Sequence, residues 1–68
     1  MEKISVRADF FCGKGIVPLL YHQKGKTIRV DRVLCCKKEQ YRIIFLCRCG
    51  CETKVLCLYN NEWYVCQD

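Results

Sequence analysis

The feature that most constrains the fold of this chain is a period of two in its side chains after residue 40. Residues 41–48 alternate between two sets that are rich in β-branched and aromatic side chains. A period of two places successive side chains on opposite faces of an extended strand. Residues 54–59 and 62–67 repeat the pattern. The C-terminal part is therefore predicted to be a three-stranded antiparallel meander.

Two turn sequences fix the register of this meander. Asn60-Asn61 suits a two-residue type I′ turn, because asparagine tolerates positive φ. Gly50-Cys51 is the expected turn between the first two strands, and both turns give the same pairing of faces. One face then carries Ile43, Phe45, Leu56, Leu58, Trp63 and Val65, and the other carries Ile44, Leu46, Val55, Cys57, Tyr64 and Cys66.

A sheet that is apolar on both faces needs a cover for the second face, and the N-terminal half is the expected cover. Residues 3–10 alternate as an amphipathic strand, and residues 16–21 form a second short strand. Pro18 places that strand at an edge or in a bulge. Residues 22–25, which include His22, are predicted to be a turn.

Residues 26–36 resume the alternation with Ile28 and Val30, but Val33 is out of phase. A bulge or bend near Asp31-Arg32 would absorb that step and let a short sheet curl. A helix over residues 31–40, capped by Asp31, is the alternative. We predict a single all-β domain over residues 1–68, with five or six antiparallel strands in a small, strongly bent barrel or sandwich.

The distribution of charged and apolar residues along the chain predicts that this domain lies in a reducing compartment. The N-terminus has charged residues where a signal peptide would be apolar, and the longest apolar runs fall far below the roughly 20 residues that span a bilayer. We therefore expect a cytoplasmic protein without a membrane partner. Twelve Lys and Arg against seven Asp and Glu give a net charge of +5, which favours acidic partners at low salt.

The segment CRCGC at residues 47–51 raises the question of a metal site. Zinc sites usually use pairs spaced C-x₂₋₄-C, and the chain has no C-x₂-C or C-x₄-C pair. Zinc remains a possible cofactor through Cys47, Cys49 and Cys51, with Cys12 as the fourth ligand. A set of disulfides that involves cysteines of the N-terminal half is an alternative interpretation. The favoured interpretation is that the cysteines are free and pack as small hydrophobic residues. Four of them occupy positions where an alternating strand would otherwise have valine or alanine: Cys36, Cys47, Cys57 and Cys66.

No catalytic constellation is readable in the sequence. A cysteine nucleophile needs a base, and the only histidine, His22, has no evident orienting partner. The carboxylates are few and dispersed, so a paired acid and base are not indicated. We expect a domain that is not an enzyme.

Two binding functions follow from the predicted sheet. A protein-interaction or assembly module, including a homodimer, is favoured, because another chain would cover an apolar face that the short N-terminal half leaves open. The alternative is a small nucleic-acid-binding barrel that combines basic and stacking side chains. Its candidate residues are Arg29, Arg42, Arg48, Lys54 and Tyr59, in which Arg42 faces Tyr59.

Several positions also carry a resemblance to a known group of proteins. They are Gly25-Lys26, Ile28, Val30, Val33, Cys47-Arg48, Val55, Leu56, Leu58-Tyr59 and Trp63-Tyr64-Val65. Over about residues 23–66 the chain resembles short uncharacterised bacterial proteins, many of them from anaerobic Firmicutes. The resemblance implies an SH3-like β barrel and no particular activity.

Overall fold

The computed structural model describes residues 2–11 and 15–66. Its elements are seven strands: β1 (Glu2–Phe11), β2 (Gly15–Gln23), β3 (Lys26–Arg29), β4 (Arg32–Lys38), β5 (Arg42–Cys49), β6 (Glu52–Tyr59) and β7 (Glu62–Cys66). The described residues contain no helix, and thus none that could cross a membrane. The all-β prediction is confirmed.

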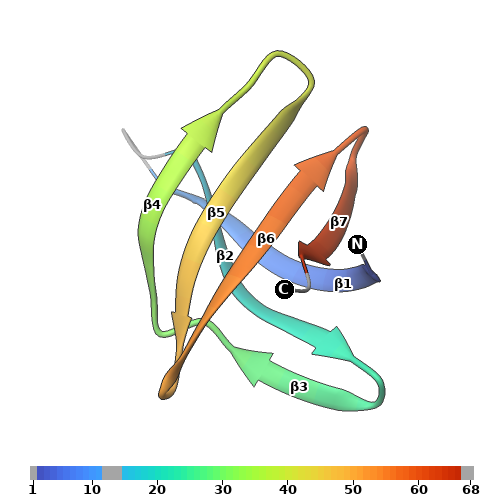
Figure 1. Cartoon of the computed structure of the whole chain (residues 1–68), viewed down its shortest axis with the longest axis vertical. Coiled ribbons are helices and arrows are strands. Elements are labelled where there is room, and N and C mark those ends of the chain that lie inside the picture. The colour runs from blue at the N-terminus through green and yellow to red at the C-terminus, as the bar shows by residue number, and fades with distance from the viewer. Residues whose placement is uncertain (1, 12–14, 67–68) are drawn as a thin grey trace.

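The seven strands form one antiparallel sheet in the order β3-β2-β1-β7-β6-β5-β4, which curls into a half-barrel (Figure 1). Strand β1 makes the curl possible, because its start pairs with β7 and the rest of it pairs with β2. The strands at the two ends of the sheet, β3 and β4, follow one another in the chain and diverge from their connection (Figure 1). The number of strands exceeds the expected five or six.

The C-terminal meander has the register that the turns predict. Phe45 pairs with Leu56 and Leu58 pairs with Trp63. Asn60 and Asn61 have φ of 54° and 63°, the left-handed values that a type I′ turn requires at both central positions. Strand β5 ends and β6 begins on either side of Gly50-Cys51, as expected.

In β2, one of the two alternatives for Pro18 is excluded, and the turn that follows the strand is shorter than predicted. Strand β2 lies between β1 and β3, so Pro18 is not in an edge strand. The predicted alternative, a bulge, is present as a register shift opposite Arg7/Ala8, and a bulge tolerates a proline because no N–H is needed there for the ladder of hydrogen bonds. His22 belongs to β2, and the turn is confined to Lys24-Gly25.

Residues 32–38 are a strand, so the alternative of a helix over residues 31–40 is wrong. The expected break near Asp31-Arg32 is present, because β3 ends at Arg29 and β4 begins at Arg32. A second irregularity follows in β4, a register shift between Val33 and Cys35. Pairing with β5 overrides the capping signal of Asp31, because the strand gains a hydrogen-bonded neighbour along its length.

The core lies on the concave side of the curled sheet. Phe45 and Leu56 are almost completely buried there, and the Phe45 and Trp63 rings lie 5.3 Å apart between centroids. The buried cluster is completed from the N-terminal half by Ile4, Tyr21 and Val30. The N-terminal strands therefore cover the face that carries Phe45.

The second apolar face of the meander is consequently left on the convex side. The interior cluster, which includes Ile4, Tyr21 and Val30 from the N-terminal half, contains none of the apolar residues of this side: Ile44, Leu46, Val55, Cys57, Tyr64 and Cys66. The expectation that the N-terminal half would cover the second face is wrong. Its physical reason is the bend in β1, which turns β2 and β3 toward the concave side.

Candidate functional site

The CRCGC segment is the end of β5 and the turn that follows it. Cys47 and Cys49 are two residues apart on the strand, and both are buried in the interior cluster, whereas Cys51 lies exposed in the turn. The turn is fastened from the β3–β4 connection, where Asp31 Oδ2 accepts a hydrogen bond from the Gly50 N–H at 2.6 Å. The segment therefore contributes core packing and a turn.

The buried thiols are held in their neutral form. Burial, followed by the neighbouring Cys49 and Cys36, raises the pKa of Cys47 to about 12. Burial and then Asp31 raise the pKa of Cys49. Since a nucleophile is a thiolate, both shifts disfavour nucleophilic chemistry at this end of β5.

The predicted zinc ligands do not converge within the described part of the chain. In residues 2–11 and 15–66 no three His, Cys, Asp or Glu side chains are placed to share a metal ion. Cys12, the fourth predicted ligand, lies outside the described residues. The seven described cysteines are free thiols. Of the four predicted to pack as small hydrophobic residues, Cys47 and Cys57 are buried, Cys66 is half-buried and Cys36 is exposed, because β4 is an edge strand.

The predicted nucleic-acid residues are brought together only in part. Arg42 and Tyr59 pair directly across β5 and β6, as predicted. Arg48 lies near the other end of β5, and Arg29 is on β3 at the far edge of the sheet. Lys54 forms an ion pair with Glu52 at 2.8 Å. These side chains do not form one continuous basic track.

The convex side of β4–β7 is the most extensive candidate site, and we call it the outer face. The register aligns its apolar side chains in two neighbouring rows across the strands. Cys57 is 1% exposed at its centre yet lies outside the interior cluster, because its strand neighbours enclose it. Around it lie five half-buried apolar residues, Ile44, Leu46, Val55, Tyr64 and Cys66.

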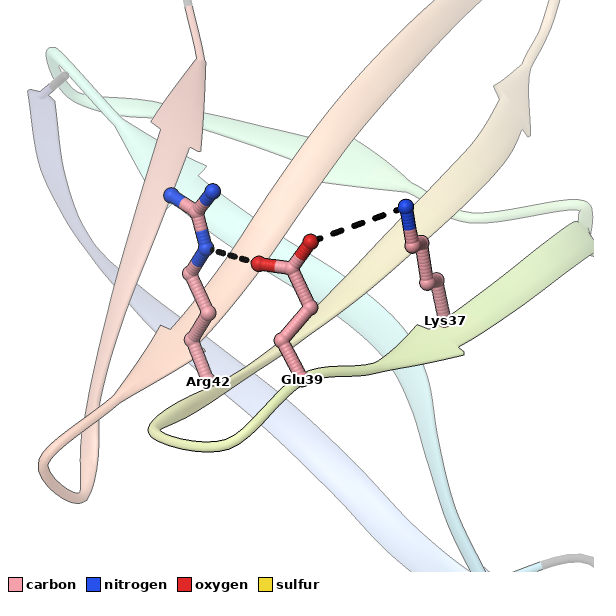
Figure 2. A network of polar contacts seen from close by, with 3 residues as sticks. All are labelled: Lys37, Glu39 and Arg42. Atoms are coloured by element: carbon pink, nitrogen blue, oxygen red, sulfur yellow. Dashed lines mark hydrogen bonds and ion pairs between the residues drawn. The ribbon is translucent and has the colours of Figure 1, made fainter.

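Ion pairs border this outer face on both sides. On one side Lys3 Nζ pairs with Glu62. On the other, Figure 2 shows Glu39 between two cations: Arg42 Nε donates to one carboxylate oxygen, and Lys37 Nζ lies 3.7 Å from the other. The hydrogen bond from Arg42 is the main reason that the pKa of Glu39 is lowered. An apolar centre with a charged rim is the usual composition of a protein interface.

A hollow of about 420 Å³ lies where this rim meets the β4–β5 turn. Its lining consists of Glu39, Gln40, Tyr41, Arg42, Cys57 and Tyr59. Burial, then Cys66, raises the pKa of the Cys57 thiol in its lining. The sequence pairing of Arg42 with Tyr59 indicated part of this hollow. Tyr41 and Glu39 carried no signal, because the turn geometry that brings them there has no distinctive motif.

Comparisons with protein-family models, with curated protein sequences and with solved structures give no significant match to this chain.

Proposed function

We propose that this chain is a non-enzymatic protein-interaction module that binds another polypeptide on its outer face. The observation that carries the proposal is the two rows of half-buried apolar side chains on the outer face across β5–β7, which lie outside the interior cluster. Contiguous apolar patches of this kind mark interaction sites on small soluble domains.

The energetics favour a partner on this face. Each Å² of apolar surface that a partner removes from water contributes roughly 25 cal/mol, and a short chain has few other sources of stability. The rim charges are already paired within the chain, as Lys3 with Glu62 and Glu39 with Arg42. The apolar centre therefore lies within a border of paired charges, with an excess of cations where Lys37 and Arg42 share Glu39.

The setting of the module follows from its thiols and its curvature. Free thiols fit a reducing compartment, so we propose that the module lies in the cytoplasm. The bent antiparallel sheet with its C-terminal meander also supports the proposed likeness to SH3-like β barrels. The alternative of nucleic-acid binding is supported by one observation, the pairing of Arg42 with Tyr59.

Site-specific photo-crosslinking in the cells that make the protein tests this proposal. A benzoylphenylalanine at position 46 probes the outer face, and the same residue at the exposed position 27 on β3 is the control. The adducts are identified by mass spectrometry. We expect a protein adduct at position 46 that Val55→Lys abolishes and that Thr27→Lys, which adds the same charge on the exposed surface of β3, leaves intact.

The identity of the adduct decides the outcome. A second copy of this chain or a different protein at position 46 supports the proposal. Cross-linking to RNA at that position, or equal adducts at positions 46 and 27, overturns it. Absence of any adduct at position 46 also overturns it, provided that circular dichroism shows that the labelled protein is folded.

A further inference from the structure

The hollow at the β4–β5 turn has the dimensions and lining of a socket for one side chain. Its volume of about 420 Å³ falls within the roughly 300–1,000 Å³ range of small-ligand sites. The lining includes Cys57 from the centre of the outer face, so the hollow is continuous with the proposed docking surface.

Two tyrosines give this socket its chemical preference. Tyr41 and Tyr59 are 74% and 47% exposed, which makes them two of the three exposed large hydrophobic residues among those described. Both line the same hollow. Tyrosine and arginine are enriched among the residues that dominate binding energy. Aromatic rings pack against one another with a preference beyond area alone.

The charges around the socket select the flanks of the ligand. Lys37, Lys38 and Arg42 surround the β4–β5 turn, against the single carboxylate of Glu39. Glu39 engages Arg42 through Nε, and the two terminal nitrogens of the guanidinium point away from that carboxylate (Figure 2). A guanidinium presented in this way can receive a second carboxylate in a bidentate geometry.

We propose that the hollow binds an aromatic side chain from an acidic segment of a protein partner. The inference rests on the proposed function and adds the chemistry of the partner to it. Tyr41 and Tyr59 hold the ring, Cys57 forms part of the apolar lining, and Arg42 with Lys37 attracts the flanking carboxylates. The net charge of +5 steers the same segment toward the domain.

A single-stranded nucleic acid is the competing ligand, because bases also stack on tyrosine. Binding of that kind uses a basic groove that follows the backbone over several nucleotides. Here Arg29 and Arg48 lie away from the hollow, and Lys54 is paired with Glu52. The observations therefore favour the acidic peptide.

Titration calorimetry with defined probes tests the inference. The probes are an amidated and acetylated Asp-Glu-Asp-Phe-Asp-Glu-Asp peptide, the same peptide with Ala for Phe, a Lys-flanked Phe peptide, and an eight-residue oligo(dT). We expect the acidic Phe peptide to bind about tenfold more tightly than the Ala peptide, a factor that corresponds to about 1.4 kcal/mol. Tyr41→Ala and Tyr59→Ala should each weaken it by about five- to tenfold. Leu34→Ala, which truncates the third exposed apolar residue, should leave it unchanged.

Each other result overturns the inference. Equal affinity for the Phe and Ala peptides would show that the hollow does not bind an aromatic side chain. Tighter binding of the Lys-flanked peptide would show that the cations around the hollow do not select acidic flanks. Oligo(dT) binding that depends on Tyr41 and Tyr59, without peptide binding, assigns the hollow to nucleic acid. Position 46 lies outside the lining of the hollow, so a protein adduct there alongside a failed titration refutes the socket and retains the docking face.

Discussion

Leu56 and Leu46 provide a matched test of the division between a concave core and a convex binding face. Leu56 on β6 is fully buried in the interior cluster, and Leu46 on β5 is half-buried on the outer face. A buried Leu→Ala substitution removes transfer energy and leaves a cavity, at a cost of about 2–5 kcal/mol. We expect Leu56→Ala to lower the free energy of unfolding by about 3 kcal/mol and Leu46→Ala by about 1 kcal/mol.

Urea unfolding in the presence of reductant, followed by the fluorescence of Trp63, measures both free energies. Trp63 packs against Phe45 in the core, so its emission reports the loss of interior packing. A thermal melt should show the same order, because 1 kcal/mol moves the Tm of a 60–100-residue domain by roughly 4–8 °C. The protein is kept at micromolar concentration and diluted tenfold as a control, which separates folding from self-association. Equal losses for the two variants would refute the assignment of faces.

Three further outcomes follow from single side chains. No described group bonds the buried Tyr21 hydroxyl, so Tyr21→Phe should raise the urea-unfolding free energy by about 1 kcal/mol; a loss of stability would contradict this. The pKa of Cys47 in the folded chain is about 12, above the ordinary thiol value, so above about pH 9 the unfolded chain binds fewer protons than the folded chain. Urea unfolding at increasing pH should therefore show a free energy of unfolding that falls by up to about 1.4 kcal/mol per pH unit. Cys47→Ala should reduce that slope. Asp31→Ala removes the 2.6 Å bond from the Gly50 N–H and should cost about 1 kcal/mol in the same assay, whereas Thr27→Ala, on the exposed surface of β3, should change stability by less than about 0.5 kcal/mol.

Local signals were sufficient for the meander and insufficient for the site. The turn at Asn60-Asn61 is predictable because asparagine tolerates positive φ, which is a property of the single residue. The strand over residues 41–48 is predictable because a period of two depends only on neighbouring side chains. The hollow joins Tyr41 from a turn with Cys57 from β6. Proximity between those two depends on how β5 pairs and how the β4–β5 turn folds, and neither leaves a motif in the chain.

By itself the sequence determined the strands, their turns and the two apolar faces of the meander, since each follows from the direction of neighbouring side chains along an extended backbone. Only the tertiary structure decided which of those faces became the core. The bend in β1 passes the chain from β7 to β2 and brings Ile4, Tyr21 and Val30 over the face of Phe45. One covered face completes a core, and the other apolar face stays outside, where we propose that a partner binds.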